Sequence, residues 1–188
     1  MPKGHVLDVA MGPGRNSVYL ASKGFQVEGI DISQEAIDCA LRLAKDKNVG
    51  IITSLVDLEK NAFIKEESYD VIICFNFLQR SLIPSIKKGL RPGGFIVYET
   101  YLIDQSQFGK PSNPDYLLNH NELLDLFRDF RCLRYHESIY NNSKAVAGII
   151  AQKNQLLRRP DKPGSSTSSG VLKGITYFTP PPHQGEGT

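Results

Sequence analysis

The sequence predicts an α/β fold, a doubly wound and mostly parallel sheet that ends in an antiparallel hairpin. Residues 6–33 have the pattern of a strand, a glycine turn, a helix and a second strand. Further short apolar runs alternate with helical patterns along residues 34–127. The last two apolar runs, 132–139 and 145–152, are separated only by turn residues, and this spacing is typical of a hairpin.

A glycine turn follows the first predicted strand. Val6, Leu7 and Val9 form a short apolar run, as expected for a strand buried on both faces. Gly12 and Gly14 come next, and a glycine backbone can approach a ligand closely because no Cβ blocks it. We predict that the helix following this turn spans residues 15–23. Its first N–H groups have no partner within the helix, so they face whatever lies above the turn.

An acidic residue marks the end of the second strand, which we expect over residues 25–30. Asp31 follows Gly14 at close to the roughly 20-residue spacing at which a carboxylate accepts hydrogen bonds from a ribose. The turn, the helix start and this carboxylate together predict a nucleotide-type binding cleft. The alternative is a tight strand-to-helix turn that binds nothing.

The next helix is predicted to begin at Ser33, whose hydroxyl can cap it, and to end at Asn48 or Gly50. Its apolar positions predict one buried face, made of Ala36, Ile37, Ala40, Leu41 and Ala44.

Strands, helices and one long insertion complete the predicted domain. The strands are expected at 50–56, 69–75 and 95–99, with a turn at 90–94. The helices are expected at 81–88 and 122–127, the second capped by Asn119 or Asn121. Residues 108–118 form an irregular insertion of a length that is often a functional lid.

The composition indicates one cytoplasmic domain with a polar tail. A chain of 188 residues can bury a substantial core, and a net charge of +2 gives no electrostatic argument for nucleic acid or an anionic membrane. Cys39, Cys74 and Cys132 are widely spaced, which favours reduced thiols over disulfides or a metal site. The sequence contains no apolar run of membrane-spanning length. Residues 1–153 are the predicted domain, and 154–188 are expected to be disordered because they cannot build a core.

The glycine turn carries a family resemblance. Residues 7–21 resemble the first motif of class I S-adenosylmethionine (SAM) dependent methyltransferases, in which an acidic residue precedes a small-x-Gly-x-Gly pattern. Asp8 is the acidic residue, and Ala10 stands where glycine is commoner. The run from Gly14 to Ser17 is most similar to the small tellurite-resistance-type methyltransferases. The turn at 90–94 is also common in class I enzymes. The resemblance covers residues 5–152 and implies a Rossmann-like, seven-stranded sheet.

The resemblance also implies a set of cofactor-binding residues. Those expected to hold the methionine end of SAM are Asp8, Ala10, Gly12, Gly14, Arg15 and Asn16. Asp31 is expected at the ribose, and Asp57 with Leu58 at the adenine, where Asp57 could instead be an ordinary loop carboxylate. Ile32 and Phe75 complete the expected set.

The acceptor residues are predicted from the ends of two strands. Asn76 and Arg80 follow the strand at 69–75, and Tyr101 follows the strand at 95–99. The Asn-Phe-Leu sequence at 76–78 lacks the two prolines with which DNA and RNA amino-methyltransferases of this fold grip a base, which argues against a nucleobase acceptor. Arg80 could bind an anionic group or simply face water, and Tyr101 could line the pocket or pack in the core.

His120 and His136 are expected to be surface or edge residues without ligand partners. We predict no metal site.

The predicted function is methyl transfer from SAM to a small molecule such as a thiol or a chalcogen oxyanion. The sulfonium is already activated, so positioning the acceptor is the main task and no catalytic base is assigned. One alternative is an NAD-type Rossmann oxidoreductase, although Ser17 occupies its third glycine position. The other is a non-catalytic SAM-binding protein, because class I enzymes usually carry a helical segment before the first strand that is missing here.

Overall fold

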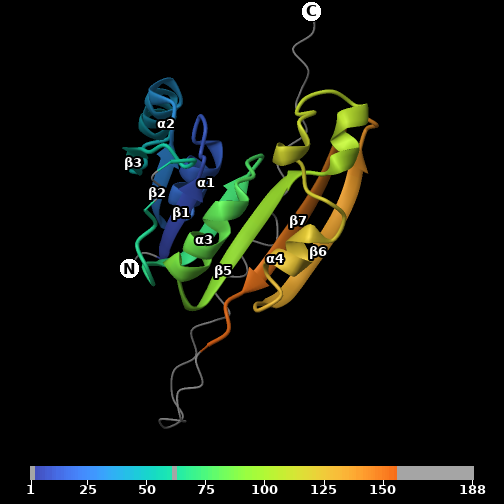
Figure 1. The fold of residues 1–188 in the computed structure, drawn as a ribbon. Coiled ribbons are helices and arrows are strands. Elements are labelled where there is room, and N and C mark those ends of the chain that lie inside the picture. The colour runs from blue at the N-terminus through green and yellow to red at the C-terminus, as the bar shows by residue number, and fades with distance from the viewer. Residues whose placement is uncertain (1–2, 61–62, 156–188) are drawn as a thin grey trace, which may run out of the picture. The chain divides into compact units, whose positions relative to one another are not determined.

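The computed structural model describes residues 3–60 and 63–155, which lie within one compact unit of residues 1–157. Seven strands form a single sheet in the order β3-β2-β1-β4-β5-β7-β6 (Figure 1). The strands are β1 (His5–Val9), β2 (Gln26–Asp31), β3 (Ile52–Leu55), β4 (Tyr69–Phe75), β5 (Leu90–Tyr101), β6 (Arg131–Tyr140) and β7 (Lys144–Gln152).

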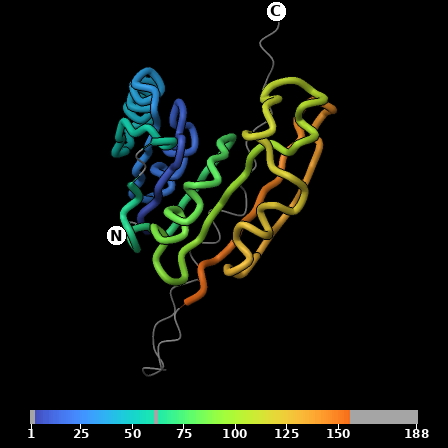
Figure 2. Tube along the Cα trace, viewed as in Figure 1, coloured from blue at the N-terminus to red at the C-terminus, as the bar shows by residue number. Residues whose placement is uncertain are grey.

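Helices and 3-10 turns connect these strands (Figure 2). The helices are α1 (Arg15–Ser22), α2 (Gln34–Asp46), α3 (Ile83–Gly89) and α4 (Glu122–Leu126). The 3-10 turns are η1 (Arg80–Leu82), η2 (Ile103–Gln107) and η3 (Pro114–Tyr116). The last two belong to the irregular segment between β5 and α4, which lies beside the turn that joins β6 to β7, since Leu102 donates its N–H to the Ala145 carbonyl.

Helices pack on both faces of the sheet. The main core joins Leu7 and Val9 of β1 to Ile86 of α3 and Leu123 of α4, and Figure 1 shows α3 and α4 on the same side. Because successive strand residues point to opposite faces, Asp8 lies on the other face. Ser17 of α1 binds Asp8 there, so α1 covers the opposite side. This is the predicted doubly wound arrangement.

The strand order reverses between β1 and β4, which are paired in parallel. In open α/β sheets, ligands bind beyond the carboxyl ends of the strands at such a switch point. The antiparallel ending is also confirmed, because β7 pairs antiparallel with both β5 and β6. Asn141 and Asn142 in the connecting turn have φ of 51° and 48°, the left-handed backbone that asparagine tolerates in turns. The Rossmann-like fold is therefore the one predicted.

Several local predictions were wrong. Leu41 is exposed and not part of the buried face of α2, because it lies one residue, about 100° of helical rotation, beyond the fully buried Ala40. The third strand covers only 52–55. Residues 90–94 are not a separate turn but the start of β5, where Leu90 pairs with Tyr69 and Phe95 with Val71, so the extra residues bulge out of the ladder.

Asn121, one of the two predicted cap residues, occupies the cap position of α4, but its side chain makes no capping hydrogen bond. The backbone of Asn121 is left-handed there, with φ of 64°. The carboxylate of Glu122 reaches back and accepts hydrogen bonds from both the backbone and the side chain of Asn119. The backbone carbonyls of Asn119 and Asn121, and not their side chains, accept N–H groups of the first turn of the helix.

Among the described residues, every helix is too short or too polar to cross a membrane. The predicted tail at 154–188 lies, except for its first two residues, outside the described residues.

Candidate functional site

The turn between β1 and α1 has three residues in the left-handed region. They are Ala10 (φ 54°), Gly12 (φ 54°) and Gly14 (φ 75°). An ideal Cβ on Gly14 would overlap the Cβ of Ala40 in α2, so this glycine lets α2 pack against the turn. On Gly12, no atom of the described residues lies within 4 Å of such a Cβ. Gly12 therefore presents bare backbone to an open side at the switch point.

Asp31 anchors this turn from the end of β2. One carboxylate oxygen accepts the N–H of Gly12 at 2.8 Å, and the other accepts the N–H of Ser33 at 2.9 Å. Ser33 also caps α2 as predicted, since its hydroxyl accepts the N–H of Ala36. Each Asp31 oxygen keeps capacity for a further donor, because a carboxylate offers about four lone-pair sites.

Asp8 lies beneath the same turn and is buried, with 2% of its surface exposed. The Ser17 hydroxyl donates to it at 2.7 Å. Burial raises the pKa of Asp8 to about 7, against the lowering effect of the Ser17 hydrogen bonds. Sequence reasoning missed this role of Ser17, although the Gly-Arg-Asn-Ser continuation was a signal for it.

The other predicted cofactor residues lie at the same edge of the sheet. Asp57 and Leu58 follow β3; Leu58 is buried in the core, whereas Asp57 accepts from Lys60 and from the N–H of Glu59. The pKa of Asp57 is lowered, chiefly by the hydrogen bond from Lys60. Arg15 and Ile32 are exposed and Asn16 is partly buried. Phe75 ends β4. We call residues 8–17, 31–33 and 57–58 the cofactor side.

The predicted acceptor residues lie across the switch point. Asn76 has a left-handed backbone, with φ of 55°, and donates its N–H to the Glu99 carbonyl. Tyr101 is partly buried, and Lys144 Nζ lies 5.4 Å from the centre of its ring. Burial raises the pKa of Tyr101, helped by the charge of Glu99. We call residues 76–80, 98–122 and 136–144 the acceptor side.

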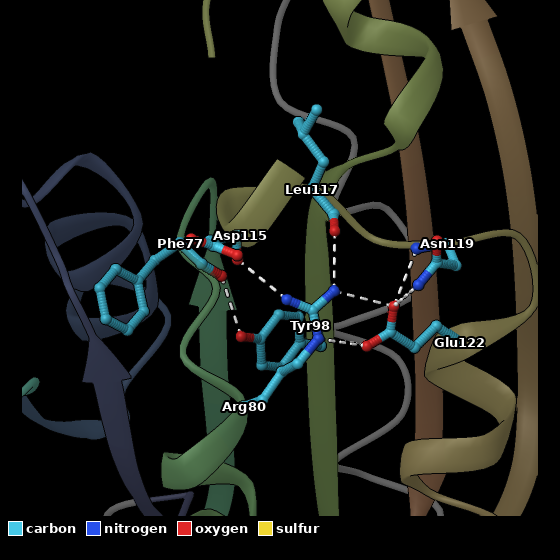
Figure 3. Close-up of polar contacts among 7 residues, drawn as sticks. All are labelled: Phe77, Arg80, Tyr98, Asp115, Leu117, Asn119 and Glu122. Atoms are coloured by element: carbon cyan, nitrogen blue, oxygen red, sulfur yellow. Dashed lines mark hydrogen bonds and ion pairs between the residues drawn. The ribbon is translucent and has the colours of Figure 1, made fainter. Parts of the chain in front are cut away.

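Arg80 is bound by protein groups on this side (Figure 3). Its guanidinium forms a two-pronged pair with the Glu122 carboxylate, with Nε to Oε1 at 2.6 Å and Nη2 to Oε2 at 3.0 Å. It also donates to the carbonyls of Asp115 and Leu117. The expected anionic partner is thus a glutamate of the chain itself, and binding of an external anion by Arg80 stays a prediction.

Both histidines face carboxylates that sequence reasoning did not connect to them. His136 Nε2 lies 3.5 Å from Glu99, across Gly148 of the intervening strand β7. His120 lies between Asp104 at 3.1 Å and Glu137 at 2.7 Å. These contacts join residues far apart in sequence, so only the strand register, which brings β6 alongside β7 and β5, could have indicated the first of them.

Comparison with known families matches the sequence model of "Tellurite resistance protein TehB" to residues 1–149 of this chain. The chain belongs to the TehB family. The TehB family is the group named from the glycine motif, so the predicted resemblance is confirmed.

Individual TehB proteins show the same relationship. The "Probable S-adenosyl-L-methionine-dependent methyltransferase TehB" of Haemophilus influenzae (strain ATCC 51907 / DSM 11121 / KW20 / Rd) is 31% identical over 142 residues, 71% of this chain and 48% of that protein. The crystal structure of TehB from Haemophilus influenzae superposes with a TM-score of 0.69 at 26% identity, covering 81% of this chain and 58% of that one. This chain therefore spans about half the length of the curated relatives it matches.

More distant relatives share part of the chain or only the fold. A ubiquinone biosynthesis O-methyltransferase of Hydrogenovibrio crunogenus is 31% identical over 100 residues, 50% of this chain and 42% of that protein. A SAM-dependent methyltransferase structure from Methanosarcina mazei has a TM-score of 0.66 at 21% identity, covering 83% of this chain and 95% of that one. The name of the TehB relative supports the predicted cofactor, SAM.

The cofactor side fits SAM. The open side at Gly12 leaves room for a ligand against the backbone. Asp31 can accept from ribose hydroxyls while keeping its two N–H donors. Asp8 lies buried beneath the turn, where it accepts the Ser17 hydroxyl.

Proposed function

We propose that this chain transfers a methyl group from SAM to a small acceptor, which is a thiol or a chalcogen oxyanion. The observation that carries the cofactor part of the proposal is the Gly12–Asp31 pair, in which bare backbone and a carboxylate flank one open side at the switch point. The acceptor class is proposed from the tellurite-resistance family to which the chain belongs. An open Cβ position alone would not indicate a ligand, since Gly24 has one as well, but at Gly12 it lies beside the Asp31 carboxylate. A dinucleotide site would favour glycine where Ser17 binds Asp8.

The cofactor residues take the roles that the motif implies. Gly12 and Gly14, with Ala10, Arg15 and Asn16, surround the methionine end, and Asp8 lies below it. Asp31 accepts from the ribose, flanked by Ile32. Asp57, Leu58 and Phe75 border the adenine.

Acceptor positioning is the task of the other side. Bound SAM supplies an activated methyl group on a sulfonium, so the chain need only orient an acceptor and exclude water. Asn76 is held by the Glu99 carbonyl at the end of β4, where its side chain can orient the acceptor. Tyr101 stands at the end of the neighbouring strand β5. A thiolate or an oxyanion needs no base to remove a proton, which agrees with the lack of an assigned catalytic base.

The test uses two glycines that both have a positive φ. Gly12→Ala and Gly24→Ala each place a Cβ on a left-handed residue (φ 54° and 89°) with no described atom within 4 Å. Only Gly12 borders the proposed cofactor. By isothermal titration with S-adenosylhomocysteine, we expect Gly12→Ala to weaken binding at least about tenfold, as when a close approach is blocked. Gly24→Ala should bind like the wild type.

The outcomes separate the proposal from its alternatives. Equal binding by both variants, or binding of NADH in place of S-adenosylhomocysteine, would contradict the assignment of the cofactor side. Methyl-labelled SAM is then incubated with dithiothreitol and with selenite. Binding without methylation of either probe would favour a non-catalytic SAM-binding protein over an enzyme for these acceptors.

A further inference from the structure

Two segments of the acceptor side approach each other near the end of β4. The first is the loop 76–79, which is fastened to β5 because the Tyr98 hydroxyl donates to the Phe77 carbonyl at 2.9 Å. In Figure 3 the Phe77 ring points away from Arg80 while its carbonyl faces Tyr98. The position of this loop is therefore set by the sheet itself.

The second segment, residues 114–119, has a weaker attachment to the sheet. Leu118 donates its N–H to the Tyr101 carbonyl and accepts the N–H of Ile103, both at 2.8 Å. Leu117 and Leu118 are buried, but Asp115 and Tyr116 are exposed. One bridge of this kind fixes Leu118 but leaves the preceding residues dependent on other contacts.

Tyr116 and Leu117 donate their N–H groups within η3, to the carbonyls of Asn113 and Pro114, and Arg80 supplies contacts that reach out of the segment. This residue directly follows the loop 76–79, and its guanidinium donates to the carbonyls of Asp115 at 2.9 Å and Leu117 at 2.8 Å. The Glu122 carboxylate orients the guanidinium through two further bonds, and it holds Asn119 by the backbone N–H at 2.8 Å. The Glu122 side chain is only 15% exposed, so water screens this pair less than a surface pair. The guanidinium and its Glu122 partner together thus tie the second segment to the first at Asp115, Leu117 and Asn119.

We propose that Arg80 and Glu122 are positioning residues, which hold segment 114–119 beside loop 76–79 and so set the place of the methyl acceptor. Arg80 then acts on the acceptor through the segment and does not touch it. The inference rests on the proposed function, because it names the acceptor as the ligand affected. Four of the five N–H donors of Arg80 are bound by the chain, so an anionic acceptor that bound more than the remaining Nη1 N–H would have to displace Glu122 or a backbone carbonyl.

Three variants distinguish positioning from direct contact. Arg80→Lys keeps the charge but loses the planar fork. Glu122→Gln keeps the size of the side chain and leaves the guanidinium in place. Asp129→Asn is the matched control, because Lys87 and Asp129 form another ion pair at the same sequence separation, at 2.5 Å, outside segment 114–119.

If Arg80 positions the segment, both variants of the pair behave alike. We expect the KM for dithiothreitol and for selenite to rise about tenfold in each, with kcat changed less, as when an acceptor is misplaced. Exchange of the Tyr116 and Leu117 amide hydrogens should accelerate about tenfold in both. The affinity for S-adenosylhomocysteine should stay at the wild-type value, and Asp129→Asn should match the wild type throughout.

Direct contact predicts a different pattern. Arg80→Lys would raise KM for selenite alone, and Glu122→Gln would leave it unchanged or lower it by freeing the guanidinium. That pattern, or wild-type amide exchange in both variants, overturns the proposal. Failure of the proposed function looks different again: the wild type would bind S-adenosylhomocysteine without methylating either probe, and the exchange comparison would still decide the role of Arg80.

Discussion

The cofactor side and the acceptor side are held together by different kinds of contact. On the cofactor side, backbone N–H groups meet short side chains over at most 19 residues, as in Gly12 with Asp31. On the acceptor side, charged side chains join residues that are distant in sequence, such as Arg80 and Glu122, which are 42 residues apart. Gln105 likewise accepts the Ala145 N–H across 40 residues.

Because of this difference, the two sides tolerate different substitutions. Backbone positions fixed by left-handed turns tolerate few substitutions, because any Cβ is strained or collides there. Ion pairs between long side chains can be exchanged while the sheet below them stays intact. A cofactor side that tolerates few substitutions, next to an acceptor side whose ion pairs can be substituted, is consistent with one fold that hosts different functions.

The largest effect is expected where backbone geometry and packing meet. Gly14→Ala should lower the free energy of unfolding by about 2–5 kcal/mol, the sum of a left-handed alanine and an overpacked contact with Ala40. Urea denaturation measures it. Gly12→Ala is the control and should lose only the strain, about 1–2 kcal/mol. Equal losses in the two variants would show that the contact with Ala40 relaxes freely.

The next largest effect is expected at Asp8, the buried carboxyl group of the cofactor side. Because the pKa of Asp8 is about 7 when folded and 3.8 ordinarily, the unfolded chain releases its proton first as the pH rises. Asp8 therefore stabilises the folded state fully below pH 3.8 and loses this contribution up to about pH 7.

Asp8→Asn should remove this pH dependence. The wild type should lose stability relative to the variant between pH 4 and 7, by up to about 1.4 kcal/mol per pH unit. Urea denaturation across this range measures the difference. Parallel curves for the two proteins would mean that Asp8 ionises normally.

A smaller gain is expected at Ala10. Its φ of 54° is costly for alanine and not for glycine. Ala10→Gly should raise the free energy of unfolding by about 0.5–1 kcal/mol after the greater flexibility of unfolded glycine is subtracted. Thermal unfolding detects the change, and Ala36→Gly in helix α2 should have the opposite sign.

The smallest effect belongs to an exposed pair on the acceptor side. The hydrogen bond with Glu137 raises the pKa of His120, with help from Asp104. Its contribution to stability is full below its ordinary pKa of 6.5 and is lost as the pH rises through the raised value. His120→Gln should abolish a slight fall in Tm between pH 6 and 9. An unchanged pH profile would show that solvent screens the pair completely.

The same contrast explains how much the sequence could predict. The cofactor side follows from local rules: glycines after an apolar run, a carboxylate at the next strand end, and Ser33 before a helix. The structure places these residues together at the switch point. The hairpin was equally local, because turn residues separate its two strands.

The acceptor side could not be predicted in this way. Whether Arg80 faces water, an acceptor or Glu122 depends on where α4 lies, and no periodicity in the sequence gives that position. The pairing of His136 with Glu99 needs the register of three strands. Boundaries such as the bulged start of β5 failed because the pairing partner, and not the Pro-Gly-Gly sequence, decides where a strand begins.

The position of Met11 makes the Gly12 turn sensitive to oxidation of this residue whenever the chain opens locally. Its sulfur occupies the space where a side chain of residue 29 would begin, and it lies 3.9 Å from the Ser17 hydroxyl. Oxidation to the sulfoxide adds a polar oxygen where there is no room. With 7% of its surface exposed, Met11 is shielded while the protein is folded. Damage to the Gly12 turn therefore begins with local opening, and a methionine sulfoxide reductase acting on the opened chain would restore it.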